Sequence, residues 1–500
     1  MSAFLSLTVS PTYLPSTMMH FEVEQNVPKR FRVDFYMRQG FVSGRLLMRQ
    51  VAILRSSFDA VTINTARLHA TQVISMAKET ILTMSSASIK YGNGATREVG
   101  FDMKEFGCRR VMVLTDPGLA ESEPVAITMG ALRGKGIDPV LFAQVRVEPT
   151  DRSLREAAEF AVHGKFDGFV GVGGGSSMDT AKAANLYSTH PADLFEYVNA
   201  PIGEGRPVPG PVKPLIGIPT TAGTGSETTG VIVFDFEEMH AKTGIAHRFL
   251  RPSLGIVDPE NTRTLPSMAA ASTGFDVLVH ALESFTNLPF DQREAPDSPA
   301  ERPAYQGSNP ISDVWAVRSI QIVSDYIVRA VSDPSDDEAR SNMLIAATFA
   351  GIGFGNAGLH LPHGMSYPVS GMVRDYIADG YPTDHAIVPH GMSVVLNAPA
   401  AFRFTGPARP GRHLEAARLM GADVSGTRES DAGEVLAAAV IRLMKQTGMP
   451  NGLSAIGYTE DDVDRLVEGT LPQHRVTKLC PRRFRPGDLR AIFLDSLKLW

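Results

Sequence analysis

The chain has 500 residues, and its 48 lysines and arginines against 54 aspartates and glutamates give a formal net charge of −6. The length suffices for two or three domains, and 43% hydrophobic with 20% charged residues excludes general disorder. The balanced charge argues against a nucleic-acid partner, and no apolar run reaches the roughly 18 residues of a membrane-spanning helix. The two cysteines, Cys108 and Cys480, predict neither a disulfide framework nor a cysteine zinc site, so we expect a reducing compartment.

Basic residues are concentrated near the N-terminus, where only Asp34 and Asp59 oppose the lysines and arginines between Lys29 and Arg67. From Met37 the chain is Arg-rich, hydroxyl-rich and amphipathic, which is typical of a mitochondrial transit peptide. We therefore predict that residues 1–75 are a targeting or disordered segment and that the mature protein lies in the mitochondrial matrix. Either Met37 is the true start or residues 1–36 extend the segment; the alternative is a disordered basic tail.

Residues 76–264 are predicted to form an α/β domain. Short apolar segments alternate with helical patterns, which indicates a largely parallel sheet. The expected strands are Val111–Leu114, Val140–Ala143, Gly168–Val172, Leu215–Ile218, Val231–Phe234 and Leu254–Val257, with helices near Ala126–Gly134, Leu154–Val162 and from Ser177.

Residues 265–500 are predicted to form a helical domain, because apolar residues there recur with the helical period. The expected helices are Met268–Phe285, Asp313–Val331, Glu338–Phe354, His413–Met420, Ala432–Thr447, Glu460–Glu468 and Pro486–Leu499. The proline- and charge-rich stretch Leu288–Pro303 is expected to be a loop between two of them.

A glycine-rich loop follows the strand at Gly168–Val172 and precedes a helix. Its three consecutive glycines, residues 173–175, allow backbone N–H groups to approach a pyrophosphate closely, and the helix directs its positive end at the same anion. Ser176 stands where the common dinucleotide motif has its third glycine, and the P-loop pattern is absent. The alternative is a strand-to-helix turn without a ligand.

A second small-residue loop, IPTTAGTGSE (218–227), follows a later strand and offers the hydroxyls of Thr220, Thr221, Thr224 and Ser226 to a ribose, a phosphate or a carboxamide. The alternative is a turn held by hydroxyl–backbone bonds. Asp116, at the end of another strand, has the position of a carboxylate that binds an adenosine ribose, and a helix N-cap explains it equally well.

Asp276 and His280 are four residues apart, so on a helix both side chains lie on one face and can bind one ion. His360, His363, His385 and His390 are candidates for the remaining ligands. We prefer His363 and His390 because each precedes a glycine. One aspartate with three histidines suits Fe(II) or Zn(II). Such a metal beside a dinucleotide predicts hydride transfer between an alcohol and a carbonyl, and a metal-dependent hydrolase is the alternative from another class.

The segments GGGSSMDTAK (173–182), PTTAGTGSE (219–227), DVLVHALE (276–283), HGM (363–365) and PHG (389–391) together resemble the iron-containing alcohol dehydrogenase family, over roughly residues 86–500. The resemblance implies an α/β N-terminal dinucleotide-binding domain followed by an all-α C-terminal domain, the dehydroquinate synthase-like fold. Metal and nicotinamide would share the cleft between them. The implied metal ligands are Asp276, His280, His363 and His390. The implied NAD contacts are Asp116, Gly173, Gly174, Gly175, Ser176, Asp179, Thr220, Thr221, Thr224 and Lys242, the last near the nicotinamide ribose.

Two features depart from the usual family pattern. Tyr367 stands where many relatives have a second histidine, so we expect it to take part in catalysis through altered proton handling near the substrate. The interval from His363 to His390 is long, and its segment Arg374–His385 could form a substrate lid.

In both features the chain resembles a transhydrogenase branch of the family. That branch implies oxidation of 4-hydroxybutyrate to succinate semialdehyde, coupled to reduction of 2-oxoglutarate to D-2-hydroxyglutarate, with NAD bound tightly and recycled. Both substrates bear carboxylates, so a cationic anchor is expected, and Lys242 and Arg374 are candidates. An NAD(P)-dependent alcohol dehydrogenase that releases NADH is the nearest alternative, and a catalytically silent assembly partner is another. We expect a homodimer that binds no membrane.

Overall fold

The computed structural model describes residues 5–8, 18–23, 31–36, 78–238, 241–381 and 386–500. The chain divides into two compact units, Met1–Ser75 and Met76–Trp500. In the first unit, β1 (Leu5–Thr8), β2 (Met18–Val23) and β3 (Phe31–Tyr36) form an antiparallel sheet in the order β1-β2-β3, which the sequence did not predict. The predicted transit segment from Met37 lies outside the described residues.

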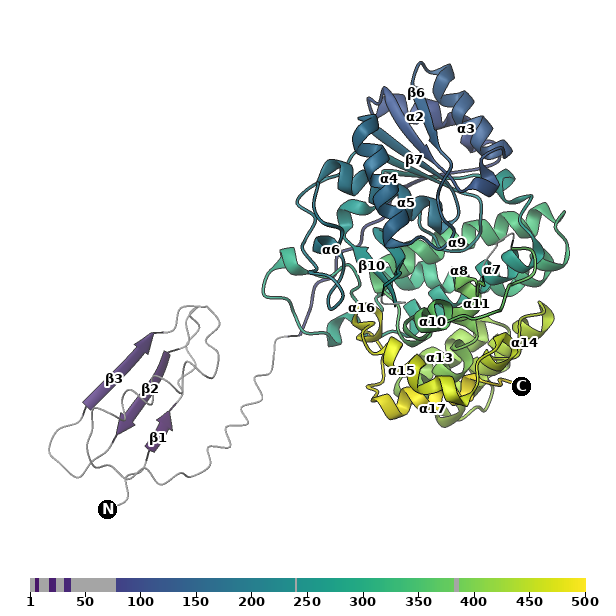
Figure 1. Cartoon of the computed structure of the whole chain (residues 1–500). Helices are drawn as coiled ribbons and strands as arrows, with labels where there is room; N and C mark the ends of the chain where they lie inside the picture. Colours follow the sequence, from purple (N-terminus) through teal and green to yellow (C-terminus); the bar gives the residue numbers. More distant parts are fainter. Residues whose placement is uncertain (1–4, 9–17, 24–30, 37–77, 239–240, 382–385) are drawn as a thin grey trace. The chain divides into compact units, whose positions relative to one another are not determined.

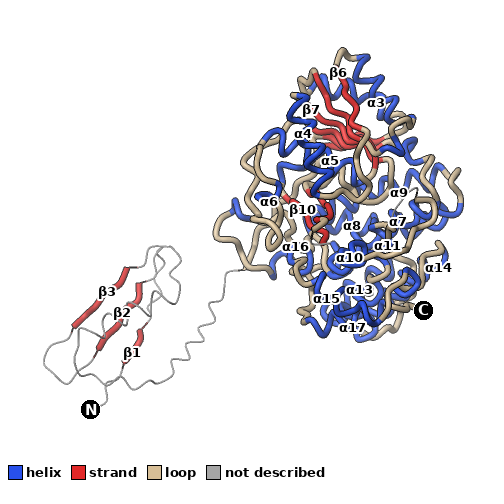
Figure 2. Tube along the Cα trace, viewed as in Figure 1, coloured by secondary structure: helices blue, strands red, loops and turns tan. Residues whose placement is uncertain are grey.

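A six-stranded parallel sheet forms the strand-rich part of the second unit (Figures 1 and 2). Its strands, in the order β4-β11-β8-β7-β5-β6, are β4 (Ser88–Tyr91), β11 (Leu254–Val257), β8 (Leu215–Pro219), β7 (Gly168–Gly173), β5 (Arg110–Leu114) and β6 (Asp138–Phe142). The helices before residue 200 are α2 (Val99–Glu105), α3 (Glu123–Gly134), α4 (Asp151–Gly164), α5 (Gly175–Thr189) and α6 (Leu194–Tyr197). The predicted parallel α/β arrangement is confirmed.

The order of the strands reverses between β5 and β7. The chain runs from β5 to β6 on one side and then crosses back past β5 to β7 on its other side. Ligands of open α/β sheets bind outside the carboxyl ends of the strands at such a switch point. The loops that follow β5, β7 and β8 therefore meet at the position where a ligand is expected.

One predicted strand lies outside this sheet. β9 (Val231–Phe236) pairs with β10 (Ala241–Ala246) as a separate antiparallel ribbon. A parallel pairing would need a long crossover, whereas the few residues between these two strands permit only a hairpin. β10 was not predicted, because its alternation of small and polar residues has little apolar content.

The chain after residue 265 is helical, as predicted. Its helices are α7 (Ser267–Thr286), α8 (Pro310–Ser332), α9 (Asp337–Ala357), α10 (Leu361–Gly371), α11 (His390–Val395), α12 (Ala398–Thr405), α13 (Pro410–Leu419), α14 (Ala432–Gln446), α15 (Val463–Thr470), α16 (His474–Thr477) and α17 (Pro486–Ser496). The boundary between two domains near residue 265 stays a prediction, since residues 76–500 form one compact unit.

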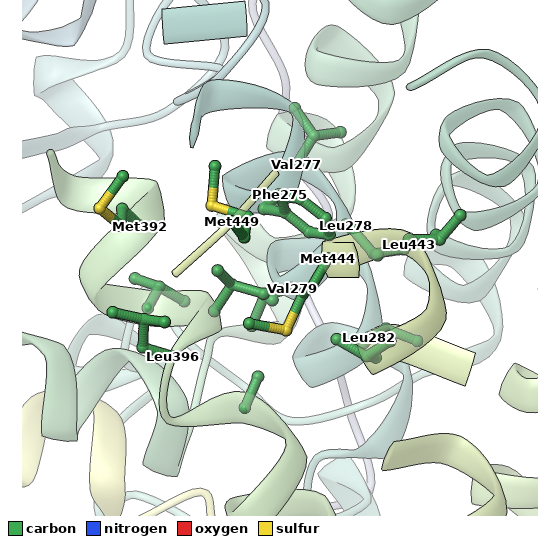
Figure 3. Packing of buried hydrophobic residues seen from close by; sticks show 14 of the residues in the cluster. Phe275, Val277, Leu278, Val279, Leu282, Met392, Leu396, Leu443, Met444 and Met449 are labelled. Atoms are coloured by element: carbon green, nitrogen blue, oxygen red, sulfur yellow. The ribbon is translucent and has the colours of Figure 1, made fainter. Parts of the chain in front are cut away.

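Helix α7 lies at the centre of the largest hydrophobic core. Four of its apolar side chains are fully buried and pack among side chains of α11 and α14 (Figure 3). They are Phe275, Leu278, Val279 and Leu282. A helix buried on every side can keep polar residues only where other groups satisfy them. The polar residues of α7 are therefore informative about the site.

Within the described residues, no single helix has the length and apolarity needed to cross a membrane. The pair α9 and α10 meets those criteria only when taken together, and the two helices are bent by 106° at their junction.

His413 of α13 is a buried histidine outside the predicted site. Its Nε2 lies 2.9 Å from Thr405 Oγ1, and its Nδ1 lies 2.9 Å from the carbonyl oxygen of Arg409. Burial disfavours the charged ring and lowers its pKa to about 4, although the Arg409 carbonyl opposes this shift. The folded protein therefore holds this ring neutral.

We predict that His413 makes the protein less stable as the pH falls from about 6.5 to 4. In that range the unfolded chain binds a proton that the folded state excludes, so this group removes at most about 1.4 kcal/mol of unfolding free energy per pH unit. The thermal unfolding midpoint of wild type should therefore decrease more steeply over this range than that of His413→Gln. Equal slopes in the two proteins would contradict the assignment.

Candidate metal and dinucleotide site

Three helices bring one aspartate and three histidines together. Asp276 Oδ1 lies 3.7 Å from Nε2 of His280, one turn later on α7, and 3.4 Å from Nε2 of His363 on α10. Nε2 of His390, the first residue of α11, lies 3.8 Å from the same oxygen. Asp276, His280 and His363 are buried, whereas the His390 side chain keeps 23% of its surface exposed. The cluster is therefore open on the side of His390.

The glycines that follow two of the histidines allow this approach. A Cβ atom at Gly391 would lie 2.0 Å from the Ser272 carbonyl oxygen and 2.8 Å from Asp276 Cβ, so only glycine permits α11 to contact α7 here. A Cβ atom at Gly364 would lie 2.5 Å from Thr477 Cγ2. The parallel His-Gly contexts in the sequence thus reflect close helix packing beside the cluster.

The donor set fits a divalent cation. Among the described residues, Asp276 Oδ1 and His363 Nε2 are buried without a hydrogen-bond partner, although they face each other. Buried polar atoms are normally paired, and one carboxylate with imidazoles is a typical donor set for Fe(II) or Zn(II). Burial raises the pKa of Asp276, but His280 and His390 outweigh it and hold that pKa below its usual range. Burial lowers the pKa of His280 to about 3, so its ring is neutral and its lone pair is available.

Glu283 contacts His363 on the side away from Asp276, and the sequence predicted no role for it. Its Oε1 accepts the backbone N–H groups of His360 at 2.9 Å and of His363 at 3.2 Å. Its Oε2 contacts Nδ1 of His363. A carboxylate on Nδ1 directs the other nitrogen, Nε2, to the cation. Because Asp276, His280 and Glu283 are spaced by four and three residues, their shared helix face could have revealed Glu283.

His360 does not join the described cluster. His360 Nε2 lies 3.0 Å from Thr286 Oγ1 instead. His385 lies outside the described residues. The ring of His280 stacks on that of Phe354, with centroids 4.0 Å apart, and on that of His363, with centroids 4.5 Å apart.

Tyr367 lies one turn after His363 on α10. Its ring centroid is 6.3 Å from that of His390, so the tyrosine borders the open side of the cluster. Its hydroxyl accepts a hydrogen bond of 2.6 Å from Arg475 Nη2. The catalytic role of Tyr367 stays a prediction, and the position of the ring beside His390 is compatible with that role.

The first glycine loop leaves a helix N-terminus open. Gly174 is the N-cap of α5 and forms no side-chain cap, and residues 174–176 are partly exposed. Gly173 adopts φ 147°, where a side chain would be strained, and a Cβ atom there would lie 2.4 Å from Ser177 Oγ. At Gly175 the Cβ atom would lie 2.7 Å from Thr224 Cγ2 of the second loop. Free N–H groups and a bare backbone are the features that bind a pyrophosphate.

The second loop lies beside the first, and Asp179 joins them. The backbone N–H of Thr220 donates to the Gly173 carbonyl at 3.0 Å. Asp179 accepts from Ser226 Oγ at 2.6 Å and from the Val233 N–H at 2.9 Å, and it pairs with Lys182 at 3.1 Å. The carboxylate of Asp179 thus has internal partners, and Thr221 and Thr224 are the partly exposed hydroxyls of the loop.

Asp116 directly follows β5, at the carboxyl edge of the sheet. It precedes the 3-10 helix Pro117–Leu119, and its side chain forms no capping bond to that helix. Partial burial raises the pKa of Asp116. Both roles expected from the sequence, the ribose contact and the helix N-cap, therefore stay predictions.

Lys242 and Glu148 lie between the glycine loop and the cluster of Asp276 with its three histidines, which we call the acid–histidine cluster. The Glu148 N–H donates to Ser176 Oγ at 3.1 Å, and its carboxylate pairs with Lys242, which also lies 3.4 Å from Asp235 Oδ1. Burial opposes ionisation of Glu148, but Lys242 and then His390 hold its pKa below the usual value. Glu148 adopts φ 57°, a strained value for this residue. Glu148 was not predicted from the sequence, because its partner Lys242 lies 94 residues away in the chain.

The predicted lid is only partly described, because residues 382–385 lie outside the description. Arg374, at its start, forms an ion pair with Asp462. Tyr381 forms a side-chain hydrogen bond with Ser272 of α7, and burial raises its pKa. Within the described part of the predicted lid, Tyr381 therefore contacts the helix that bears Asp276, and the function of the lid stays a prediction.

Two family models match this chain, and both describe the same family of proteins. Residues 86–259 match the model described as iron-containing alcohol dehydrogenase, and residues 301–497 match the C-terminal model of the Fe-containing alcohol dehydrogenase family. A relative from Mus musculus named "Hydroxyacid-oxoacid transhydrogenase, mitochondrial" is 54% identical over 419 residues, which are 83% of this chain and 90% of the relative.

Solved structures share the fold. A 1,3-propanediol oxidoreductase is 28% identical with a TM-score of 0.73, over 83% of this chain and all of that chain. Sulfoacetaldehyde reductase from Bifidobacterium kashiwanohense, solved in complex with NAD+, is 26% identical with a TM-score of 0.68, over 84% of this chain and 99% of that chain. The predicted fold class is thereby confirmed.

We predict that His280→Ala abolishes metal binding while the fold is kept. The variant removes one imidazole of the Asp276 cluster, and three donors no longer enclose the ion. After loading with Zn(II) or Fe(II) and desalting, elemental analysis should give about one ion per wild-type chain and less than a tenth of that in the variant. His163→Ala, at an exposed position on α4, is the matched control. Full metal content in His280→Ala would refute the cluster as the site.

We predict that Glu283→Gln weakens metal affinity without removing a ligand. The amide keeps the volume of the buried carboxylate and loses the negative charge that orients His363. Loss of such an outer partner typically costs 10- to 100-fold in affinity, measurable by competition with a chelator. Glu159→Gln, on the exposed face of α4, should leave the affinity unchanged. An unchanged affinity in Glu283→Gln would show that His363 needs no orienting carboxylate.

Proposed function

The chain belongs to the iron-containing alcohol dehydrogenase family, and we propose that it is a hydroxyacid–oxoacid transhydrogenase. The observation that carries the proposal is the 54% identity, over 83% of the chain, to a relative of that name. The open glycine loop and the acid–histidine cluster support it, because both lie beside the single Lys242–Glu148 pair.

The proposed reaction oxidises 4-hydroxybutyrate to succinate semialdehyde and reduces 2-oxoglutarate to D-2-hydroxyglutarate. The carbinol carbon of the first substrate loses a hydride and its hydroxyl loses a proton. The oxo carbon of the second gains a hydride and its oxygen gains a proton. Electrons and protons therefore balance between the two acids, and the overall exchange consumes no free NAD.

The proposal includes the residues that would hold the two cofactors. Fe(II) or Zn(II) would be held by Asp276, His280, His363 and His390. NAD would contact Asp116, Gly173, Gly174, Gly175, Ser176, Asp179, Thr220, Thr221, Thr224 and Lys242. When bound, the cation would polarise the hydroxyl or oxo oxygen of the substrate, and the nicotinamide would accept and return the hydride.

The chain's own residues prepare the cleft for this exchange. The uncapped N-terminus of α5 offers its N–H groups to a pyrophosphate. The exposed side of His390 leaves the cluster accessible to a small acid, and Tyr381 forms a hydrogen bond with Ser272 of α7, the helix that bears Asp276. Glu148 and Asp235 fix the Lys242 ammonium between the two binding regions.

An NAD-dependent alcohol dehydrogenase of the same family is the second candidate. It would use the same residues and differ only by releasing NADH. The hydrolase expected as an alternative loses its support, since the chain matches an oxidoreductase family over most of its length.

A mitochondrial location also belongs to this proposal. The Mus musculus relative is named as mitochondrial, and the basic segment from Met37 has the composition of a transit peptide. The mature chain would then begin after that segment, in the matrix.

We predict that the metal-loaded protein converts 4-hydroxybutyrate and 2-oxoglutarate into equal amounts of succinate semialdehyde and D-2-hydroxyglutarate without added NAD. With 4-hydroxybutyrate deuterated at C4, the label should appear at C2 of the 2-hydroxyglutarate, and mass spectrometry measures it. An excess of free unlabelled NADH should not dilute the label, because a retained cofactor does not exchange with the solution.

Two results would overturn this function. Product formation that requires added NAD, with label diluted by free NADH, would identify a dehydrogenase that releases its cofactor. Absence of 2-hydroxyglutarate from a protein with full metal content would exclude the transhydrogenase altogether.

A further inference from the structure

A substrate carboxylate in the cleft requires a cation, and this requirement rests on the proposed function. In 4-hydroxybutyrate and in 2-oxoglutarate, two methylene groups separate the reacting carbon from the distal carboxylate. A carboxylate removed from water is costly unless a charged donor pairs with it. Because the spacing is the same in both acids, one cation at one place can serve both.

The cations near the cleft that the sequence suggested already have partners. Lys242 is paired with Glu148 and Asp235 and is only 2% exposed. Arg374 is paired with Asp462, and its side chain is 53% exposed. Both charges are thus compensated within the protein.

Lys182, on the helix of the glycine loop, is also compensated. Its ammonium pairs with Asp179 at 3.1 Å and donates to the Val231 carbonyl at 2.8 Å. With a side chain that is 0% exposed, it has no free side for a substrate.

Arg475 is different, because its partners are neutral. Its Nη1 donates to the Tyr305 hydroxyl at 3.2 Å and its Nη2 to the Tyr367 hydroxyl at 2.6 Å. In the part of the chain that the structure describes, no carboxylate lies within 4.0 Å of this guanidinium. Burial lowers the pKa of Arg475, but the two tyrosines outweigh it and raise the pKa, so the group stays charged. A partly buried charge without a counter-ion is the feature expected of an anion site.

Only the side chain of Tyr367 separates Arg475 from His390 of the acid–histidine cluster. Arg475 lies on α16, which packs on α10, the helix of His363 (Figure 1). Tyr367, which holds the guanidinium, is one turn after His363, and its ring lies 6.3 Å from that of His390. Gln473, at the start of α16, donates to the Lys242 carbonyl at 3.2 Å. Arg475 is therefore close to both predicted ligand regions.

The guanidinium is also accessible. Arg475 lines a hollow together with Thr243 and Gly244 of β10 and with Pro472 and Gln473. Arg475 is itself partly exposed, unlike the buried Lys182 and Lys242.

We propose that Arg475 binds the distal carboxylate of both the hydroxy acid and the oxo acid, with Tyr305 and Tyr367 fixing its orientation. A guanidinium presents parallel N–H donors that match the two oxygens of a carboxylate. Arg475 thereby selects acids over neutral alcohols and sets the reacting carbon at the open side of His390.

The test compares an acid with its neutral isostere. Arg475→Gln should raise the KM for 4-hydroxybutyrate at least tenfold with a smaller change in kcat, while kcat/KM for 4-hydroxybutanamide changes less than twofold. Arg475→Lys, which keeps the charge, should lie between wild type and Arg475→Gln. Arg482→Gln is the matched control. Like Arg475, Arg482 contacts an aromatic ring through its guanidinium, but it donates to a backbone carbonyl and lies at an exposed position.

Calorimetric titration with 2-oxoglutarate makes the test independent of turnover. Arg475→Gln should bind it at least tenfold more weakly than wild type and Arg482→Gln, with metal content and unfolding midpoint unchanged. Equal binding in Arg475→Gln and wild type would overturn the anchor, and so would an equal loss of activity on the acid and the amide. If wild type binds 2-oxoglutarate through Arg475 yet transfers no hydride, the proposed function fails while the anchor stands.

Discussion

The buried carboxylate oxygen of Asp276 is the point around which the rest of the site is arranged. It faces imidazole nitrogens of three histidines at 3.4 to 3.8 Å, and it has no hydrogen-bond partner among the described residues. A carboxylate in such a place would normally be protonated, but the histidines hold its pKa low. Three helices must therefore converge at one atom, and this requirement determines their packing.

The supporting residues follow from that convergence. Helix α11 can approach α7 only with glycine at position 391, since a Cβ atom would lie 2.0 Å from the Ser272 carbonyl oxygen. Glu283 then holds the backbone and ring of His363, which fixes the nitrogen that faces Asp276. Small residues and an outer carboxylate thus have the same purpose, to bring the donors close and to keep them oriented.

Sequence reasoning succeeds where the pattern is local. Asp276 and His280 lie one helical turn apart, and the long helices and apolar strands repeat with their own periods. It fails where the partner is distant: Glu148 and Lys242 are 94 residues apart, and Arg475 is 108 residues from Tyr367. An arginine without a counter-ion is indistinguishable in sequence from one in an ion pair. The short helices α11 and α16 were missed for the same reason, because tertiary contacts rather than length define them.

The distribution of charge also bears on the order of events. Two carboxylates compensate the charge of Lys242, whereas Arg475 has no carboxylate partner among the described residues. Tyr367 lies between Arg475, which contacts its hydroxyl, and His390 of the cluster, which lies beside its ring. Both acids need the same two contacts, at the distal carboxylate and at the reacting oxygen. They cannot occupy them together, so the semialdehyde must leave before the oxo acid binds. A single anchor beside a single cluster therefore implies that the two acids exclude each other and react in alternation.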